Sequence, residues 1–393
     1  MERTWARIGW LYALGVLAAA QLGKMSALVP LITIDLTMGL TVAGVLISLL
    51  EVGGATLGFA AGLFVDRIGV RRVLLSGIGC FALAGLGESL APSVTALVGM
   101  RLLEGAAYLC VVVAAPLLIF RTAPIGKQGV ALALWSSFVP VGFAIGATTS
   151  GWFADVVSWR AATLAWAVVA ALMLLVSSRL ALAPSASGAS TPRLLSIPRW
   201  PIWALTLAFG CYASFAVGLI ALLPTFLVEQ AGATPRVAGL VGGLAAFISV
   251  LGVLIAAWLR HRGRNFSVWI VVAIVVPAAL LFAVFADGAS VWRVVLLMLV
   301  LSTVSGIYSG LAFALLPALA RSDNEMAVAN GLTLQFGATG SLLGPPMFAV
   351  CVERWGWSAA AVAGALVSST CLVLMQWARA DRTCPSPPLR TPA

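Results

Sequence analysis

Four charged side chains of this sequence lie inside long apolar runs, and these are the residues that could do chemistry: Lys24, Glu51, Arg101 and Glu104. A charge at the centre of an apolar membrane helix costs roughly 3 kcal/mol, so it is seldom placed there without a role. Such groups bind ions or polar solutes, carry protons, or neutralise one another. Arg101 and Glu104 are three positions apart, so one helix would present both on the same face.

Lys24 and Glu51 have two interpretations, which the sequence leaves open. Lys24 could attract an anionic group of a small solute, or it could pair with Glu51 at a similar depth in the next helix. Burial and a nearby cation change the proton affinity of a carboxyl group in opposite directions, which suits a group that takes up and releases protons. Glu51 and Glu104 are therefore the candidate proton-coupling residues, although Arg101 and Glu104 could equally form a structural pair. Glu88 is expected to reach water near the end of its helix.

The predicted substrate-binding residues are the charged Lys24 and Arg101 together with polar residues in otherwise apolar helices. Each could instead form a hydrogen bond between helices. The added members are Gln21, Tyr108, Tyr212, Tyr308, Asn330 and Gln335. Because the intramembrane charges all fall before residue 105, we expect charge-dependent binding and coupling in the first half of the chain.

Composition indicates an all-α membrane protein. The chain of 393 residues is 62% hydrophobic, and only 9% of its residues are charged. So few charges could not cover the apolar surface of a water-soluble protein. The net charge of +10 is better explained by basic cytoplasmic loops than by a nucleic-acid partner. One histidine, six cysteines without a CxxC pair and no phosphate-binding loop predict no metal site, no cofactor, no use of nucleotides and no enzymatic activity.

Cutting the chain at charges, prolines and glycine-rich turns predicts twelve membrane-spanning helices. They cover residues 8–30, 40–65, 73–91, 94–120, 128–154, 161–183, 201–228, 237–259, 267–286, 293–320, 326–352 and 357–378. Alternate loops, beginning with the N-terminal segment, carry most basic residues, whereas the loops between them hold only Arg160, Arg236, Arg293 and Arg354. This asymmetry predicts cytoplasmic termini in a cell inner (plasma) membrane.

The sequence contains two similar halves. Residues 1–183 and 201–378 are the predicted six-helix bundles, joined by a polar cytoplasmic linker at 184–200 and followed by a disordered cytoplasmic tail at 379–393. ALVPL at 27–31 corresponds to ALLPT at 221–225, and TVAGVLISL at 41–49 corresponds to RVAGLVGGL at 236–244. Parallel repeats of this kind are typical of transporters, with the substrate site at mid-depth between the halves.

The stretch GLFVDRIGVRR at 62–72 resembles the signature of the major facilitator superfamily. RLLEG at 101–105 and GFAIGATTSG at 142–151 resemble two further motifs of that family, although Ala147 and Ser150 depart from the second, an exporter motif. The resemblance implies a bacterial-type secondary transporter with twelve helices in two pseudo-symmetric bundles, which works by alternating access and as a monomer. It also implies a conformational latch between the halves, formed by Gly62, Asp66, Arg67, Gly69, Arg71 and Arg72.

Three functions remain open. Lys24, Arg101 and the imperfect exporter motif favour proton-coupled uptake, or symport, of a small organic anion. The alternative is efflux of a drug or metabolite by proton antiport. The third is a membrane receptor on the same fold that transports nothing. The expected partners are therefore a small-molecule substrate, favoured as anionic, together with protons and the lipid bilayer.

Overall fold

The computed structural model describes residues 2–58, 68–124, 127–180, 198–262, 266–286, 288, 290–320 and 323–380. Within these ranges the chain is helical apart from short turns, and it contains no β-strand. The prediction of an all-α protein is confirmed.

The helices of the first half account for the spans predicted before residue 184, but two spans are interrupted. The described part of span 40–65, residues 40–58, contains two helices around the 3-10 turn η1, and span 128–154 breaks at Ser136 and Ser137 into two helices. The elements are α1 (Glu2–Asp35), α2 (Leu40–Ser48), η1 (Leu49–Glu51), α3 (Val52–Leu57), α5 (Val70–Ser89), α6 (Val94–Thr122), α7 (Gln128–Trp135), α8 (Phe138–Val156) and α9 (Trp159–Arg179).

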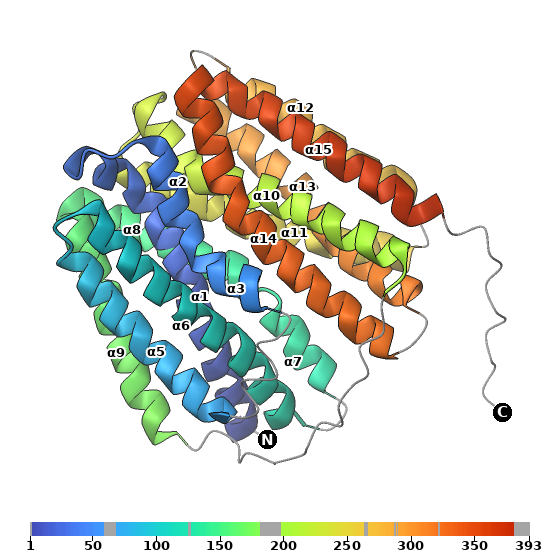
Figure 1. Cartoon of the computed structure of the whole chain (residues 1–393), viewed down its shortest axis with the longest axis horizontal. Helices are drawn as coiled ribbons and strands as arrows, with labels where there is room; N and C mark the ends of the chain where they lie inside the picture. The colour runs from blue at the N-terminus through green and yellow to red at the C-terminus, as the bar shows by residue number, and fades with distance from the viewer. Residues whose placement is uncertain are drawn as a thin grey trace.

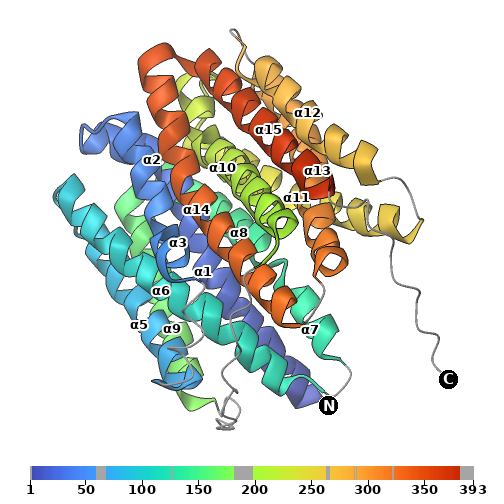
Figure 2. The same cartoon turned by 45° about the vertical axis from the view of Figure 1, so that its right-hand side comes forward.

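The second half consists of six uninterrupted helices in the described ranges. They are α10 (Trp200–Glu229), α11 (Pro235–His261), α12 (Phe266–Val284), α13 (Val291–Leu319), α14 (Asp323–Trp355) and α15 (Trp357–Ala380). Figures 1 and 2 show the first-half helices, blue to green, on one side of the molecule and the second-half helices, yellow-green to red, on the other. We call the end at which α1 begins and α15 ends the terminal face, and the other end the opposite face.

Ten described helical segments are long and apolar enough to cross a membrane. The other two predicted spans, 128–154 and 326–352, correspond to α7–α8 and to α14, which are not among the ten. Hydropathy therefore supports ten of the twelve predicted spans, and the remaining two are supported only as helices.

Close helix contacts explain the glycines of the two halves. Gly146 of α8 lies against the backbone of α1 at Ala20, and Gly340 of α14 lies against the backbone of α10 at Gly210. A Cβ at either glycine would collide with a backbone carbonyl oxygen of its neighbour. Small residues permit such contacts, so the α1–α8 packing of the first half has a counterpart in the α10–α14 packing of the second.

The two halves share an apolar core at the opposite face. One cluster joins first-half residues such as Leu28 and Ile32 to second-half residues such as Leu222 and Phe348. Toward the terminal face, the second half has a core of its own, which includes Leu205 and Leu316 and contains no first-half residue. The halves are therefore packed together at one end and have separate cores at the other.

Candidate functional site

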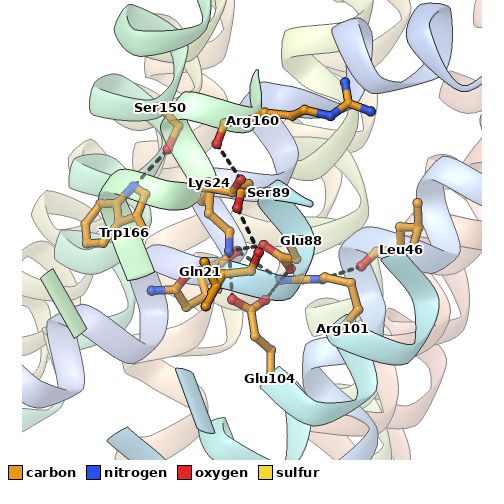
Figure 3. Close-up of polar contacts among 12 residues, drawn as sticks. Gln21, Lys24, Leu46, Glu88, Ser89, Arg101, Glu104, Ser150, Arg160 and Trp166 are labelled. Atoms are coloured by element: carbon orange, nitrogen blue, oxygen red, sulfur yellow. Dashed lines mark hydrogen bonds and ion pairs between the residues drawn. The ribbon is translucent and has the colours of Figure 1, made fainter. Parts of the chain in front are cut away.

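Four buried charges from three helices of the first half form one network: Lys24 on α1, Glu88 on α5, and Arg101 and Glu104 on α6. The Lys24 ammonium donates to Glu88 Oε2 at 2.5 Å and to Glu104 Oε1 at 2.7 Å. Arg101 Nη1 donates to Glu104 and lies 3.9 Å from Glu88 Oε1. All four side chains are fully buried, and Figure 3 shows them pointing toward one another. Two cations thus face two carboxylates, and we call these residues the ion network.

The break in the second span explains the position of Arg101. The last carbonyls of a helix have no partner within it, and they form the negative end of its dipole. At the end of α2, Arg101 Nε donates to the Leu46 carbonyl at 2.9 Å and Nη2 donates to the Ile47 carbonyl at 3.0 Å. Gly105 allows this approach, because a Cβ there would lie 2.6 Å from the Leu49 carbonyl oxygen. Arg101 therefore neutralises a helix end as well as a carboxylate.

The surroundings of Glu88 and Lys24 differ from those that the sequence predicts. Glu88 is fully buried rather than open to water, and the described partners of Lys24 are Glu88 and Glu104 rather than Glu51. Residues of the opposite face cover the end of α5: Arg160 pairs with Asp35 at 2.6 Å and donates to the Ala91 carbonyl at 3.3 Å. Residues this far apart in sequence meet only in the folded bundle, so the sequence does not reveal that Glu88 is buried.

Glu51 lies outside the ion network, at the seam between the halves. It is 9% exposed, and the Tyr108 side chain of α6 lies close to it. In the part of the chain that the structure describes, no cation lies within ion-pair distance of Glu51. A Cβ built on Gly54 of α3 would lie 3.5 Å from Glu51 Oε2 and 2.9 Å from the Ala338 side chain of α14. The Glu51 carboxylate therefore approaches the surface on which the second half packs.

Gln21 and Gln335 also lie near these groups. The Gln21 side chain donates to the Leu17 carbonyl at 3.1 Å, and the Gln21 backbone carbonyl accepts from Arg101 at 3.3 Å. Gln335 of α14 donates across the seam to the Ala55 carbonyl at 2.5 Å. Gln21 therefore supports the ion network, whereas Gln335 joins the two halves at Ala55, four residues after Glu51.

The remaining predicted binding residues do not gather around the charges. The rings of Tyr212 and Tyr308 contact each other within the second half, with centroids 4.7 Å apart and planes inclined by 38°. Tyr212 is hydrogen-bonded to Ser305, and the fully buried Tyr308 lies beside Cys371. Asn330 is exposed on α14. The sequence shows that these polar residues lie in apolar helices, but it does not show that the two tyrosines face the interior of the second half.

Part of the predicted latch can be located. Gly62, Asp66 and Arg67 lie outside the described residues. Gly69 precedes α5 with a φ of 98°, a conformation that favours glycine. Arg71 and Arg72 are exposed at the start of α5, and Arg71 donates to the Ser178 carbonyl at the end of α9, at 2.8 Å. This described contact lies within the first half and reaches the negative end of a helix.

A contact between the halves at the opposite face was not anticipated from the sequence. Four helices that begin there have a Ser or Thr cap: Ser93, Ser158, Thr234 and Ser290. The cap of α2 is Gly39, which offers no side chain. Glu353 of α14 takes this role, because its carboxylate accepts from the Thr41 backbone N–H at 3.1 Å and from the Thr41 hydroxyl. The second half thus caps a helix of the first.

A second polar contact between the halves lies on the central helices. The Ser26 hydroxyl of α1 donates to the Ala221 carbonyl of α10 at 2.7 Å. Together with the Glu353–Thr41 contact, it reinforces the shared apolar core at the opposite face.

Comparison with known proteins agrees with this architecture. A family model described as the Major Facilitator Superfamily matches residues 11–345. The chain is 30% identical over 171 residues to a putative metabolite transport protein of Bacillus subtilis (strain 168), a match that covers 42% of this chain and 37% of that protein. It is 35% identical over 185 residues to a probable multidrug-efflux transporter of Mycobacterium tuberculosis (strain CDC 1551 / Oshkosh), covering 47% and 38%. The matches thus span well under half of each curated relative.

Among solved structures, the fold is similar to that of a bacterial homolog of the human lysosomal transporter Spinster. The TM-score is 0.79, and the comparison covers 96% of this chain and 95% of that one at 14% sequence identity. At so low an identity the likeness concerns the fold alone.

Proposed function

The chain belongs to the major facilitator superfamily, and from that premise we propose that it is a proton-coupled secondary transporter that exports a small drug or metabolite. Transport by alternating access requires two bodies that open in turn on either side of a membrane. We assign these bodies to residues 1–183 and 201–378, the linker to 184–200, and a cytoplasmic tail to 379–393. We further propose a monomer in a bacterial inner membrane, with both termini in the cytoplasm.

One observation carries the proposal: the halves share a core at the opposite face and have separate cores toward the terminal face. This is the arrangement of one end state of alternating access. With the terminal face in the cytoplasm, as the basic loops favour, this state would be the inward-facing one. The polar contacts of Ser26 and Glu353 across the opposite face would have to break for the protein to open outward.

Glu51 is the stronger of the two candidate proton carriers. A proton on Glu104 would leave two buried cations with a single ionised carboxylate, which is costly in an apolar interior. A proton on Glu51 would instead remove a buried charge for which the described residues provide no cation. Glu51 also lies on an element that packs against α14, so its charge can affect the contact between the halves.

Export is supported by the surroundings of the cations. Lys24 and Arg101 both face carboxylates and are fully buried, so an anionic substrate would have to displace Glu88 or Glu104 to reach them. Curated relatives include a probable multidrug-efflux transporter, which is consistent with this direction. Uptake of a small organic anion remains the second candidate, favoured by Ala147 and Ser150 in place of the exporter motif's residues.

The test is a flux measurement in proteoliposomes that contain a pH-sensitive dye. Candidate drugs, amines and carboxylates are added under an imposed pH gradient, and proton movement is recorded for the wild type and for Glu51→Gln. Export by antiport predicts that substrate and protons move in opposite directions, and that Glu51→Gln loses the proton movement. Substrate flux that is indifferent to the gradient and to a protonophore would contradict proton coupling.

A further inference from the structure

We propose that Glu51 and Tyr108 form the binding site for an organic cation with apolar surface, and that this cation and a proton compete for the Glu51 carboxylate. The inference rests on the proposed transport function and names the substrate class. It reverses the preference for anions that Lys24 and Arg101 suggest in the sequence.

The balance of buried charge is the first argument. Among the described residues, the buried charged side chains inside the first half are two cations and three carboxylates: Lys24, Arg101, Glu51, Glu88 and Glu104. The ion network matches its two cations with Glu88 and Glu104, so Glu51 is the remaining charge. An uncompensated charge in an apolar interior is costly, and either a proton or a bound cation would remove that cost. An anionic substrate would increase it.

The position of Glu51 is the second argument. η1, which carries Glu51, packs against α6 and α14, whereas α5, which carries Glu88, has its main contacts with α6 and α9. Of the three carboxylates, Glu51 is thus the one whose element meets the second half. Gly54 lies next to the Glu51 carboxylate and faces Ala338 of α14, so no side chain of α3 separates the carboxylate from the second half at this position. A ligand between the halves would meet Glu51 before it met the ion network.

The groups around the site favour a cation with hydrocarbon or aromatic surface. On α6, Tyr108 places a hydroxyl group and an aromatic ring close to the carboxylate, and rings attract organic cations. Across the seam, the α14 side chain that faces Gly54 is the apolar Ala338, and Gln335 is polar but uncharged.

Among the residues that the structure describes, the titratable and charged neighbours of Glu51 provide it with no counter-ion. α6 carries Tyr108, the paired residues Arg101 and Glu104, and Arg121 in its last turn, and α2 and α3 contain no charged residue. On α14 the charged residues lie in the first turn or near the end: Asp323, Glu325, Glu353 and Arg354. The matched Arg101–Glu104 pair adds no net charge at the seam.

Competition at one carboxylate would produce exchange. When Glu51 holds a proton, it cannot attract a cation, and binding of a cation requires the proton to leave. Each half-cycle therefore carries either the proton or the cation, which couples their movements in opposite directions. No covalent step and no further co-substrate is needed.

Two isosteric ions of opposite charge test the proposal directly. Binding of tetraphenylphosphonium and of tetraphenylborate to the detergent-purified full-length protein is measured by calorimetry at pH 6 and pH 8. We expect tetraphenylphosphonium to bind more tightly than tetraphenylborate, and more tightly at pH 8 than at pH 6. In a weakly buffered solution, its binding should release up to one proton per cation at the lower pH. Glu51→Gln should weaken binding by about tenfold or more and abolish both the pH dependence and the proton release.

Further variants separate the site from general damage. Glu51→Asp keeps the charge and should retain pH-dependent binding, and Tyr108→Phe should weaken binding while keeping the pH dependence. Glu229→Gln is the matched control, because Glu229 is an exposed carboxylate at the end of α10 on the opposite face. Preference for tetraphenylborate, failure to bind either ion, or tetraphenylphosphonium binding that ignores both pH and Glu51→Gln would overturn the inference.

The cation site and the transport function can be refuted independently of each other. Flux of a carboxylate driven by a pH gradient in proteoliposomes, without tetraphenylphosphonium binding, would refute the cation site and leave proton-coupled transport standing. Tetraphenylphosphonium binding that depends on Glu51, in a protein that moves no solute under any gradient, would support the site and refute the transporter.

Discussion

Replacing Lys24 by methionine would test whether the ion network is a balanced unit. The ammonium makes hydrogen bonds to Glu88 at 2.5 Å and to Glu104 at 2.7 Å, and all three side chains are fully buried. Without Lys24, Arg101 faces two carboxylates. Removing one partner from a buried ion pair typically costs about 3–5 kcal/mol, because a charge is left uncompensated. We therefore expect Lys24→Met to lower the free energy of unfolding by about that amount.

The double variant Lys24→Met/Glu88→Gln restores the balance, with Arg101 facing Glu104 alone. It should lose clearly less stability than the sum of the two single variants, with a coupling energy of up to about 3 kcal/mol. Equilibrium unfolding in mixed micelles of increasing dodecyl sulfate content, followed by tryptophan fluorescence, measures all four proteins. Glu229→Gln serves as the surface control and should change stability by less than about 0.5 kcal/mol.

The outcome that refutes this reasoning is additivity. If Lys24→Met and Glu88→Gln add within about 0.5 kcal/mol, the two groups do not interact in the way that their geometry indicates. Wild-type stability of Lys24→Met would likewise show that the carboxylates do not depend on the ammonium. In that case Lys24 would be available to a substrate, and the uptake of anions would regain its support.

Three further changes have expected outcomes. Glu353→Gln weakens the capping of α2, so the equilibrium between the closed and open states of the opposite face should shift toward the open state by about 1 kcal/mol. Distances between spin labels on opposite-face loops of the two halves measure the populations of the two states, and Glu229→Gln should leave them unchanged. Gly146→Val forces a side chain into the backbone of α1 and should lower the unfolding midpoint by several degrees, whereas Gly9→Val, where nothing lies within 4 Å of the added Cβ, should not. Arg160→Ala uncovers the end of α5, so carbodiimide labelling of Glu88 should become faster than in the wild type; an unchanged rate would mean that another group covers it.

Much of the architecture followed from the sequence, because a bilayer restricts what an apolar chain can do. Backbone groups must be satisfied inside the hydrocarbon, so long apolar runs become helices, and both the all-α class and the family are confirmed. The stretch 142–151 resembles a glycine-containing family motif, and the structure shows that its Gly146 lies against α1. Where the pattern was weak, in 128–154 and 326–352, the helices exist but hydropathy alone does not identify them as spans.

The partners of the charged residues were decided by the tertiary structure. The sequence determined that Lys24, Glu51, Arg101 and Glu104 are charges in apolar helices, and that function should be sought among them. Helical periodicity relates residues three or four apart, which is why it could place Arg101 beside Glu104. It carries no information about which helices become neighbours, how they are rotated, or where one of them breaks. The packing of α1, α5 and α6 joined Lys24 to Glu88, and the turn at η1 directed Glu51 to the seam, because only the folded bundle fixes the distances over which charges interact.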